Sequence, residues 1–171
     1  MVVEAKYQTI WRRSWATGFD FLFLFPLLGF QFALVDSALA ASSKVGLAPL
    51  CPLVGIAYNV VMRWQYGATL GEQTVGLRVV DISEKALTLR QALLREVYGV
   101  ATSGYGTLLT ISALAAGKSP PVDDKVSTWI SSAFIVIELV TILSSAKRRG
   151  PQDFIAGTVV VVEPARVIVR G

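Results

Sequence analysis

The sequence of 171 residues contains no histidine and a single cysteine, Cys51. The missing histidine excludes Ser–His–Asp triads, histidine metal ligands and histidine proton relays. One cysteine excludes a disulfide framework within the chain and any zinc site built from several cysteines. Charge is also scarce, at 16% of residues against about 25% in an average soluble domain, whereas 53% of residues are apolar. This composition is unlike that of a disordered chain or of a soluble enzyme domain, and the length predicts one domain over residues 1–171.

The sequence offers little from which to build an enzyme. It shows no nucleophile beside an evident base and no cluster of metal ligands, so we expect neither catalysis nor a bound cofactor. The glycines of residues 67–73 do not form a phosphate-binding loop, because the GxxxxGK[ST] pattern is missing. The net charge of +4 is compatible with nucleic-acid binding, but the placement of the charges favours a membrane, so no nucleic-acid partner is expected.

Four apolar runs approach the length of about 20 residues that a helix needs to cross a bilayer. The runs cover residues 15–35, 47–62, 97–116 and 129–146. Pro49 and Pro52 lie near the start of the short second run, where they mark a first turn or a kink. The sequence therefore predicts an all-α membrane protein with four transmembrane helices in a lipid bilayer.

Lysine and arginine are distributed unevenly between the connections. Only three of these 16 residues, Lys44, Lys118 and Lys125, lie in the first and third connections. The others lie in the N-terminal segment, in the connection 63–96 and in the tail 147–171. Because cytoplasmic segments are enriched in both residues, we expect both termini in the cytoplasm and the protein in the inner or plasma membrane. The tryptophans form an interfacial belt at the ends of the runs: Trp11, Trp15, Trp64 and Trp129.

An alternative for the first run is a secretory signal that is cut near residues 37–40. We favour a membrane span, because the run is longer than a usual signal core and contains Asp20.

The segments outside the runs predict a small cytoplasmic β element. Residues 76–81 are typical of a short strand, and residues 86–89 of a return strand that would form a hairpin. Thr88 is a suitable N-cap for a helix that follows it. The β-branched run at 158–162 is expected to join Val79 and the residues beside it in one sheet.

Four short motifs follow one another along residues 10–162. Arg12-Arg13 is followed by Asp20 inside the first apolar run. The other three are GATLG with VGLRVVD at 67–81, LRQALLR at 89–95 and RRGPQDFIAGTVV at 148–160. In this order the motifs resemble the RDD family of membrane proteins, which is named for one arginine and two aspartates. The resemblance implies that Arg13, Asp20 and Asp153 are the family-motif residues.

The chain departs from the family pattern at two positions. Glu72 stands where the family usually has a lysine, and Gln152 stands where a histidine often precedes the final aspartate. The resemblance implies a membrane location, together with either ion- or proton-coupled transport or an accessory role in a larger assembly. No role that depends on that lysine or histidine is carried over.

Each apolar run has one face of small and polar residues at helical spacing. These faces comprise Arg13, Thr17, Asp20 and Gln31; Cys51, Gly55, Asn59 and Arg63; Gly99, Ser103, Thr107 and Thr110; and Ser131, Glu138, Thr141 and Ser145. Because charge at bilayer depth costs roughly 2.5–3.5 kcal/mol, we expect the faces to meet inside the bundle.

Depth along the helices places Asp20, Asn59 and Glu138 in one cytoplasm-facing polar pocket, with Arg13 and Arg63 at its mouth. In the first interpretation, Asp20 and Glu138 bind and release protons or cations. In the second, the faces are packing surfaces of a non-catalytic accessory subunit in a homo-oligomer or a larger membrane complex. In the third, Asp20 simply pairs with Arg13 or another arginine.

Asp153 lies outside this pocket in the sequence-based picture. Its plainest interpretation is a solvated ion-pair cluster with Arg148 and Arg149.

Overall fold

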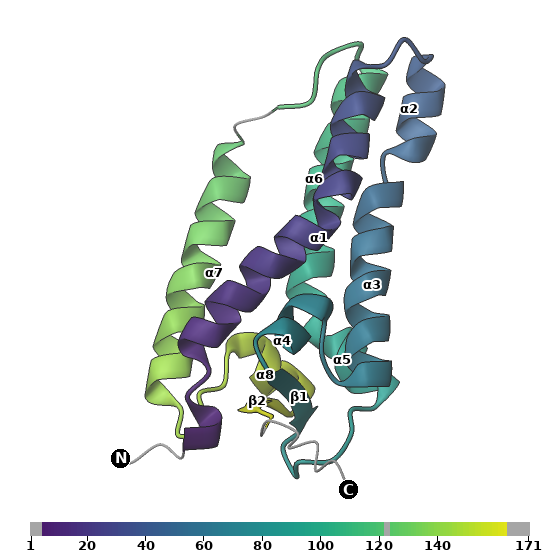
Figure 1. Cartoon of the computed structure of the whole chain (residues 1–171). Coiled ribbons are helices and arrows are strands. Elements are labelled where there is room, and N and C mark those ends of the chain that lie inside the picture. The colour runs from purple at the N-terminus through teal and green to yellow at the C-terminus, as the bar shows by residue number, and fades with distance from the viewer. Residues whose placement is uncertain (1–4, 122–123, 164–171) are drawn as a thin grey trace, which may run out of the picture.

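The computed structural model describes residues 5–121 and 124–163 (Figure 1). Long helices run side by side and leave a compact group of short elements at one end. The long segments are α1 (Ile10–Asp36), α2 (Ala41–Leu47) with α3 (Leu50–Tyr66), α6 (Val97–Ala115) and α7 (Lys125–Ser144). The short elements are η1 (Ala5–Tyr7), α4 (Leu70–Thr74), β1 (Leu77–Asp81), α5 (Leu89–Arg95), α8 (Pro151–Ala156) and β2 (Thr158–Val162).

Within the described residues, three helical segments are long and apolar enough to cross a membrane: Ala5–Asp36, Ala41–Tyr66 and Lys125–Ser144. Helix α6 has 19 residues but is not among them, because glycine and hydroxyl residues lower its hydropathy. The prediction of four spans is therefore supported for three segments. The first two extend beyond the predicted 15–35 and 47–62 at both ends, whereas α7 begins before and ends before the predicted 129–146, and α6 stays within 97–116. Pro49 is the N-cap of α3, at the break that separates it from α2.

Local sequence signals explain where the short elements begin and end. Thr69 and Thr88 each form a capping box, with Glu72 and Gln91 respectively, which satisfies the first backbone N–H groups of α4 and α5. The predicted cap at Thr88 is confirmed. Helix α3 ends at Gly67, whose φ of 74° is the left-handed conformation that glycine adopts without strain.

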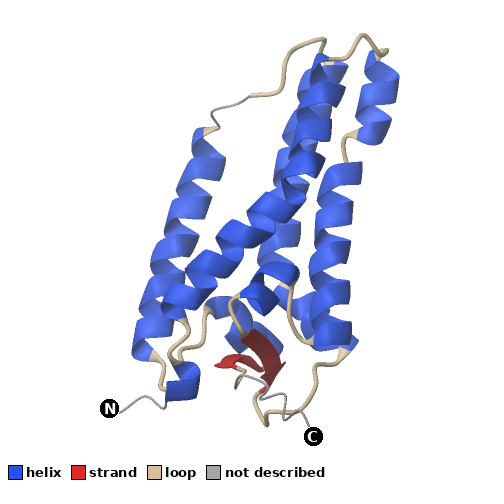
Figure 2. Ribbon diagram, viewed as in Figure 1, coloured by secondary structure: helices blue, strands red, loops and turns tan. Residues whose placement is uncertain are grey.

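The sheet has two antiparallel strands, which Figure 2 shows as a small element beneath the helices. Val79 pairs with Val160 and Val80 with Val159, so the predicted union of these two runs is confirmed. The predicted return strand at 86–89 is wrong, because α5 begins at Leu89 and the partner strand comes from the C-terminal end of the chain. The predicted hairpin is wrong for the same reason. Residues 164–171 of the predicted tail lie outside the described residues.

The two faces of the sheet bury different residues. Leu77 and Val79 pack with Ala16 of α1 and with Leu87, and Val80 packs with Tyr7 on the other face. Side chains alternate across a strand, so a five-residue strand can bury both faces only if helices or turns cover both. The sheet thereby joins the beginning of α1 to the cluster of short elements.

Helix α4 lies directly against α1 at Gly71. A Cβ atom on Gly71 would lie 2.1 Å from the carbonyl oxygen of Ala16 and 2.7 Å from the carboxyl carbon of Asp20. The Ala16 oxygen is a main-chain atom, so it cannot retreat without moving the α1 backbone. Only glycine fits this contact.

We expect Gly71→Ala to destabilise the protein by about 3 kcal/mol, because the added methyl group must displace main-chain atoms. The measurement is the thermal unfolding midpoint of the purified protein in detergent. Gly104→Ala is the matched control, since a Cβ there meets nothing within 4 Å and alanine is the better helix former. Equal midpoints for the two variants would contradict the close contact between α4 and α1.

Candidate functional site

A small cavity of about 90 Å³ lies where the long helices meet the short elements. Residues from α1, α3, α4, α5, α7, α8 and β2 line it: Arg13, Ala16, Thr17, Asp20, Arg63, Glu72, Arg95, Glu138, Gln152 and Val160. Four of the five residues predicted for the polar pocket are therefore brought together. The fifth, Asn59, does not line the cavity. Its side-chain amide donates a hydrogen bond of 3.3 Å to Glu96, which pairs with the lining residue Arg63.

Asp20 accepts three hydrogen bonds from two neighbouring segments. The donors are the hydroxyl of Tyr58 at 2.8 Å, the hydroxyl of Thr69 at 2.6 Å and the backbone N–H of Gly71 at 2.8 Å. Asp20 thus fixes the start of α4 against α1 and α3. The predicted pairing of Asp20 with Arg13 is wrong, because the Arg13 guanidinium points instead to the C-terminal part of the chain.

Asp153 is the most deeply buried carboxylate of the site, with no exposed surface. It forms ion pairs with Arg13, at 2.9 Å, and with Arg95. It also accepts the N–H of Gly150 at 2.8 Å, which caps α8. The predicted solvated cluster is wrong, because Arg148 directs its guanidinium to main-chain carbonyl oxygens.

The charges around Asp153 decide its protonation state. Burial by itself would raise the pKa of Asp153, but the positive charges of Arg95 and Arg13 and the N–H of Gly150 hold it well below its usual value. The carboxyl group is therefore ionised at neutral pH.

A second ion-pair cluster joins α3, α4 and the junction of α5 and α6. Arg63 binds Glu72, at 3.2 Å, and Glu96. Burial alone would raise the pKa of Glu72, but the charges of Arg63 and Arg95 outweigh it and keep that pKa below its usual value. Glu72 also accepts the N–H of Thr69 at 2.8 Å, so the residue where the family pattern has a lysine serves here as a capping and pairing group.

Glu138 differs from the other carboxylates of the site. It is half-buried on α7 and accepts one hydrogen bond, of 2.9 Å, from the side-chain amide of Gln152. Among the residues that the structure describes, no lysine or arginine pairs with it. Glu138 is thus held by a neutral group, whereas Asp153, Glu72 and Glu96 are held by arginines.

Sequence reasoning missed Glu72, Glu96, Arg95 and Gln152 as site residues. Arg95 and Glu96 offered one usable signal, because they form a charged pair directly before an apolar run. Gln152 and Glu72 had no signal of their own beyond their difference from the family pattern. The described residues contain no group of three or more Cys, Asp or Glu side chains that could hold a metal ion.

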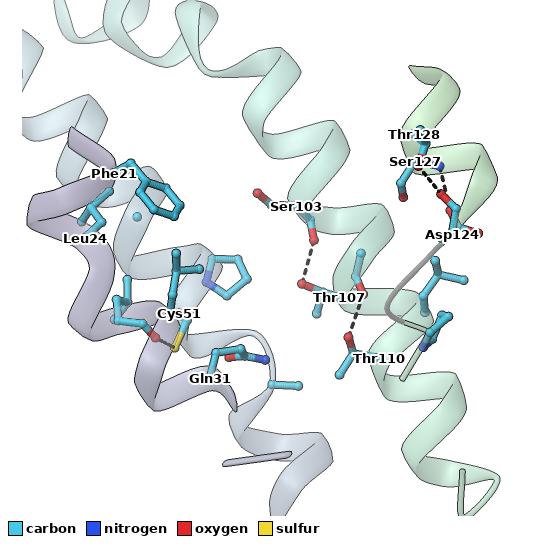
Figure 3. Close-up of a pocket in the computed structure, with 18 residues that line it drawn as sticks. Phe21, Leu24, Gln31, Cys51, Ser103, Thr107, Thr110, Asp124, Ser127 and Thr128 are labelled. Atoms are coloured by element: carbon cyan, nitrogen blue, oxygen red, sulfur yellow. Dashed lines mark hydrogen bonds between the residues drawn. The ribbon is translucent and has the colours of Figure 1, made fainter. Parts of the chain in front are cut away.

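A larger cavity of about 620 Å³ lies between α1, α3, α6 and the start of α7, toward the end far from the sheet. Figure 3 shows Phe21, Leu24 and Gln31 on one side, and Ser103, Thr107 and Thr110 on the other. The hydroxyl groups of Thr107 and Thr110 donate to carbonyl oxygens of their own helix. The lining is therefore mainly apolar in character.

A family model described as the RDD family matches residues 7–157 of the chain. No curated protein and no solved structure matches it.

We expect Asp153→Asn to destabilise the protein by about 3–5 kcal/mol near neutral pH, because two buried guanidinium groups lose their counter-charge. Asp36→Asn is the control, since Asp36 is exposed. The measurement is the free energy of unfolding in detergent, and equal losses in both variants would contradict the central role of Asp153.

The ion pairs of Asp153 with Arg13 and Arg95 also predict that the stability of the protein depends on pH. The folded pKa of Asp153 is depressed, whereas the unfolded value is about 3.9. The stabilisation from Asp153 is therefore complete above about pH 5 and is lost as the pH falls toward the folded pKa. Unfolding midpoints measured during acidification should fall more steeply for the wild type than for Asp153→Asn, so that the two converge. Parallel curves would refute this.

Proposed function

The chain belongs to the RDD family, and on this premise we propose that it is a four-span membrane protein that transports protons or small cations through Glu138. The observation that carries the proposal is the binding of Glu138 by a neutral amide alone, inside a cavity where the neighbouring acids are paired or saturated with donors.

The arrangement of the helices supports the four-span topology. Helices α1 and α6 run away from the sheet, and α3 and α7 run back toward it (Figure 1). Because the direction alternates from helix to helix, α6 must cross between the two ends as the other three do, and we therefore include it as a span. The alternation also brings η1 and β2 to the same end of the bundle. Trp11, near the start of α1, and Trp129, near the start of α7, are 80% and 75% exposed. Figure 1 shows these two helix starts at opposite ends of the bundle, which suits interfacial tryptophans. The excess of Lys and Arg supports a cytoplasmic location for the sheet end, and we propose that the protein lies in the inner or plasma membrane.

The balance of charges supports binding of a positive species. Within the small cavity and the two ion-pair clusters beside it, three arginines meet five carboxylates, which gives these eight groups a formal charge of −2 when all are ionised. The eight groups are Arg13, Arg63, Arg95, Asp20, Glu72, Glu96, Glu138 and Asp153. An ionised carboxylate at membrane depth costs roughly 2.5–3.5 kcal/mol, so a proton or a cation on Glu138 relieves that cost.

Asp20 has a positioning role in this proposal. Its three donors stabilise the carboxylate and fasten α4, and a group so saturated exchanges a cation poorly. Glu138 is therefore the exchanging group, and Asp20, Arg13, Arg63 and Asn59 shape the cavity around it.

We expect purified wild-type protein in liposomes to carry protons or monovalent cations down an imposed gradient. Glu138→Gln should reduce the flux at least tenfold, because the variant amide takes up no proton and has no negative charge to attract a cation. Glu163→Gln, in a part-exposed pair with Arg78 outside the cavity, is the matched control and should retain full flux. Normal flux in Glu138→Gln would remove this residue from the mechanism, and a silent wild type would favour an accessory role.

An accessory role in a larger membrane complex is the second candidate. The cavity of about 620 Å³ between α1, α3, α6 and α7 favours it, since a helix of a partner or of a second copy could fill the space. Helix α7 also exposes apolar side chains along its length, among them Ile135, Val136 and Leu143.

The accessory role is tested by filling this cavity. Gly106 lines it and Gly104 does not, and a Cβ at either position meets nothing within 4 Å. For an accessory subunit, Gly106→Leu should release a stoichiometric partner or a second copy that co-purifies in mild detergent, whereas Gly104→Leu should not. Retention of the partner by both variants would exclude this cavity as the contact.

A further inference from the structure

Two buried polar atoms at the small cavity have no hydrogen-bond partner among the described residues. They are Nε of Arg95 and Oε1 of Gln152, and both side chains line the cavity. Arg95 is only 6% exposed, so bulk water does not satisfy its free N–H. A buried polar group without a partner costs about 1–3 kcal/mol, and such atoms in a cavity commonly mark bound water or a ligand.

The two atoms require opposite kinds of hydrogen-bond partner. Nε of Arg95 donates a hydrogen bond, whereas Oε1 of Gln152 accepts one. A species that fits both must accept and donate, as a water molecule does and a bare metal cation does not. The cavity volume of about 90 Å³ has room for about three waters, at about 30 Å³ each.

The remaining oxygens of the cavity are poorly suited to a metal cation. Hard cations require about six oxygen ligands. Asp20 and Glu72, which face the cavity from α1 and α4, already accept hydrogen bonds or ion pairs. Arg13, Arg63 and Arg95 face it from α1, α3 and α5 and supply no acceptor. Glu138 is thus the one carboxylate among the described lining residues that no cation or set of donors engages, and a proton requires only one such oxygen, whereas a metal cation would have to complete its shell from water and neutral oxygens.

We propose that the site binds the proton, as the charge carried in the proposed transport, on Glu138 beside a water cluster held by Arg95 Nε and Gln152 Oε1. This inference rests on the proposed function for its role in transport. A proton that arrives as hydronium passes to a carboxylate oxygen of Glu138. The transfer leaves a neutral water in the cavity and a neutral carboxylic acid on α7, and release reverses it.

Gln152 suits both protonation states of Glu138. Its NH₂ group donates to the carboxylate in the structure. After protonation, a rotation of the amide by half a turn presents its C=O group, which accepts the new O–H, while the NH₂ group turns to the water and donates to it in place of Oε1. Gln152 is therefore a positioning residue, and it directly precedes Asp153, whose ion pairs hold α8 in place.

The test is infrared difference spectroscopy of the full chain in lipid nanodiscs during acidification. We expect a carboxylic-acid C=O band that grows with acid, shifts in D₂O and is absent from Glu138→Gln. Na⁺, K⁺ and Ca²⁺ should leave it unchanged. Gln152→Met, of similar size but without a strong acceptor, should keep the band and move it to higher frequency, because the acid loses its hydrogen bond. Glu163→Gln should retain the band that Glu138→Gln removes.

Three results would overturn the proton assignment. One is the absence of a band that Glu138→Gln removes, and another is displacement of that band by Na⁺. The third is an unchanged band frequency in Gln152→Met, which would remove Gln152 from the site.

The flux assay distinguishes failure of the proton assignment from failure of the proposed transport. Cation flux without the acid band leaves transport intact and defeats the proton, whereas the band without any flux leaves the proton site intact and defeats transport.

Discussion

The double ion pair of Asp153 is the interaction on which the rest of the structure depends. Asp153 lies in a helix of six residues near the end of the described chain, yet it binds Arg13 at the start of the first long helix and Arg95 at the end of α5, just before α6 begins. Removing the carboxylate leaves two guanidinium groups buried without compensation, which is the most costly kind of loss in a protein interior. The short elements and the bundle therefore hold together as a unit.

The position of the other polar groups follows from this pairing. Because Asp153 fixes α8, the neighbouring Gln152 faces Glu138 on α7. Because Arg13 is engaged by Asp153, Asp20 two turns further along α1 is left to accept Tyr58, Thr69 and Gly71. The acids of the site thus differ in how many partners they have. Asp20 accepts three hydrogen bonds and Asp153 pairs with arginines, whereas Glu138 accepts one hydrogen bond from a neutral amide.

The sequence predicted the elements better than their partners. Apolar runs of helical length located the long helices, and the Thr88 cap and the valine runs located α5 and the sheet, since these signals are local. The pairing of Arg13 with Asp153 spans 140 residues, and helical periodicity says which face is polar but not what it meets. The same limit explains the wrong hairpin: strand 77–81 has its partner at the far end of the chain, where no turn signal reports it.

The two cavities show that polar contacts, rather than apolar packing, organise this fold. In a lipid environment, apolar side chains gain little by leaving lipid for another helix, so close packing and hydrogen bonds must supply the association. At the sheet end, the ion pairs supply it and the cavity there is small. At the far end, the hydroxyl groups of Thr107 and Thr110 donate to carbonyl oxygens of their own helix, and a space of about 620 Å³ is left between the helices.

Helix α7 is held near its middle by the stacking of Phe134 on Tyr98 and by the hydrogen bond between Glu138 and Gln152. The single hydrogen bond of Glu138 therefore has two consequences, because it holds the group that we propose to exchange protons and it helps to fasten α7 to the short elements.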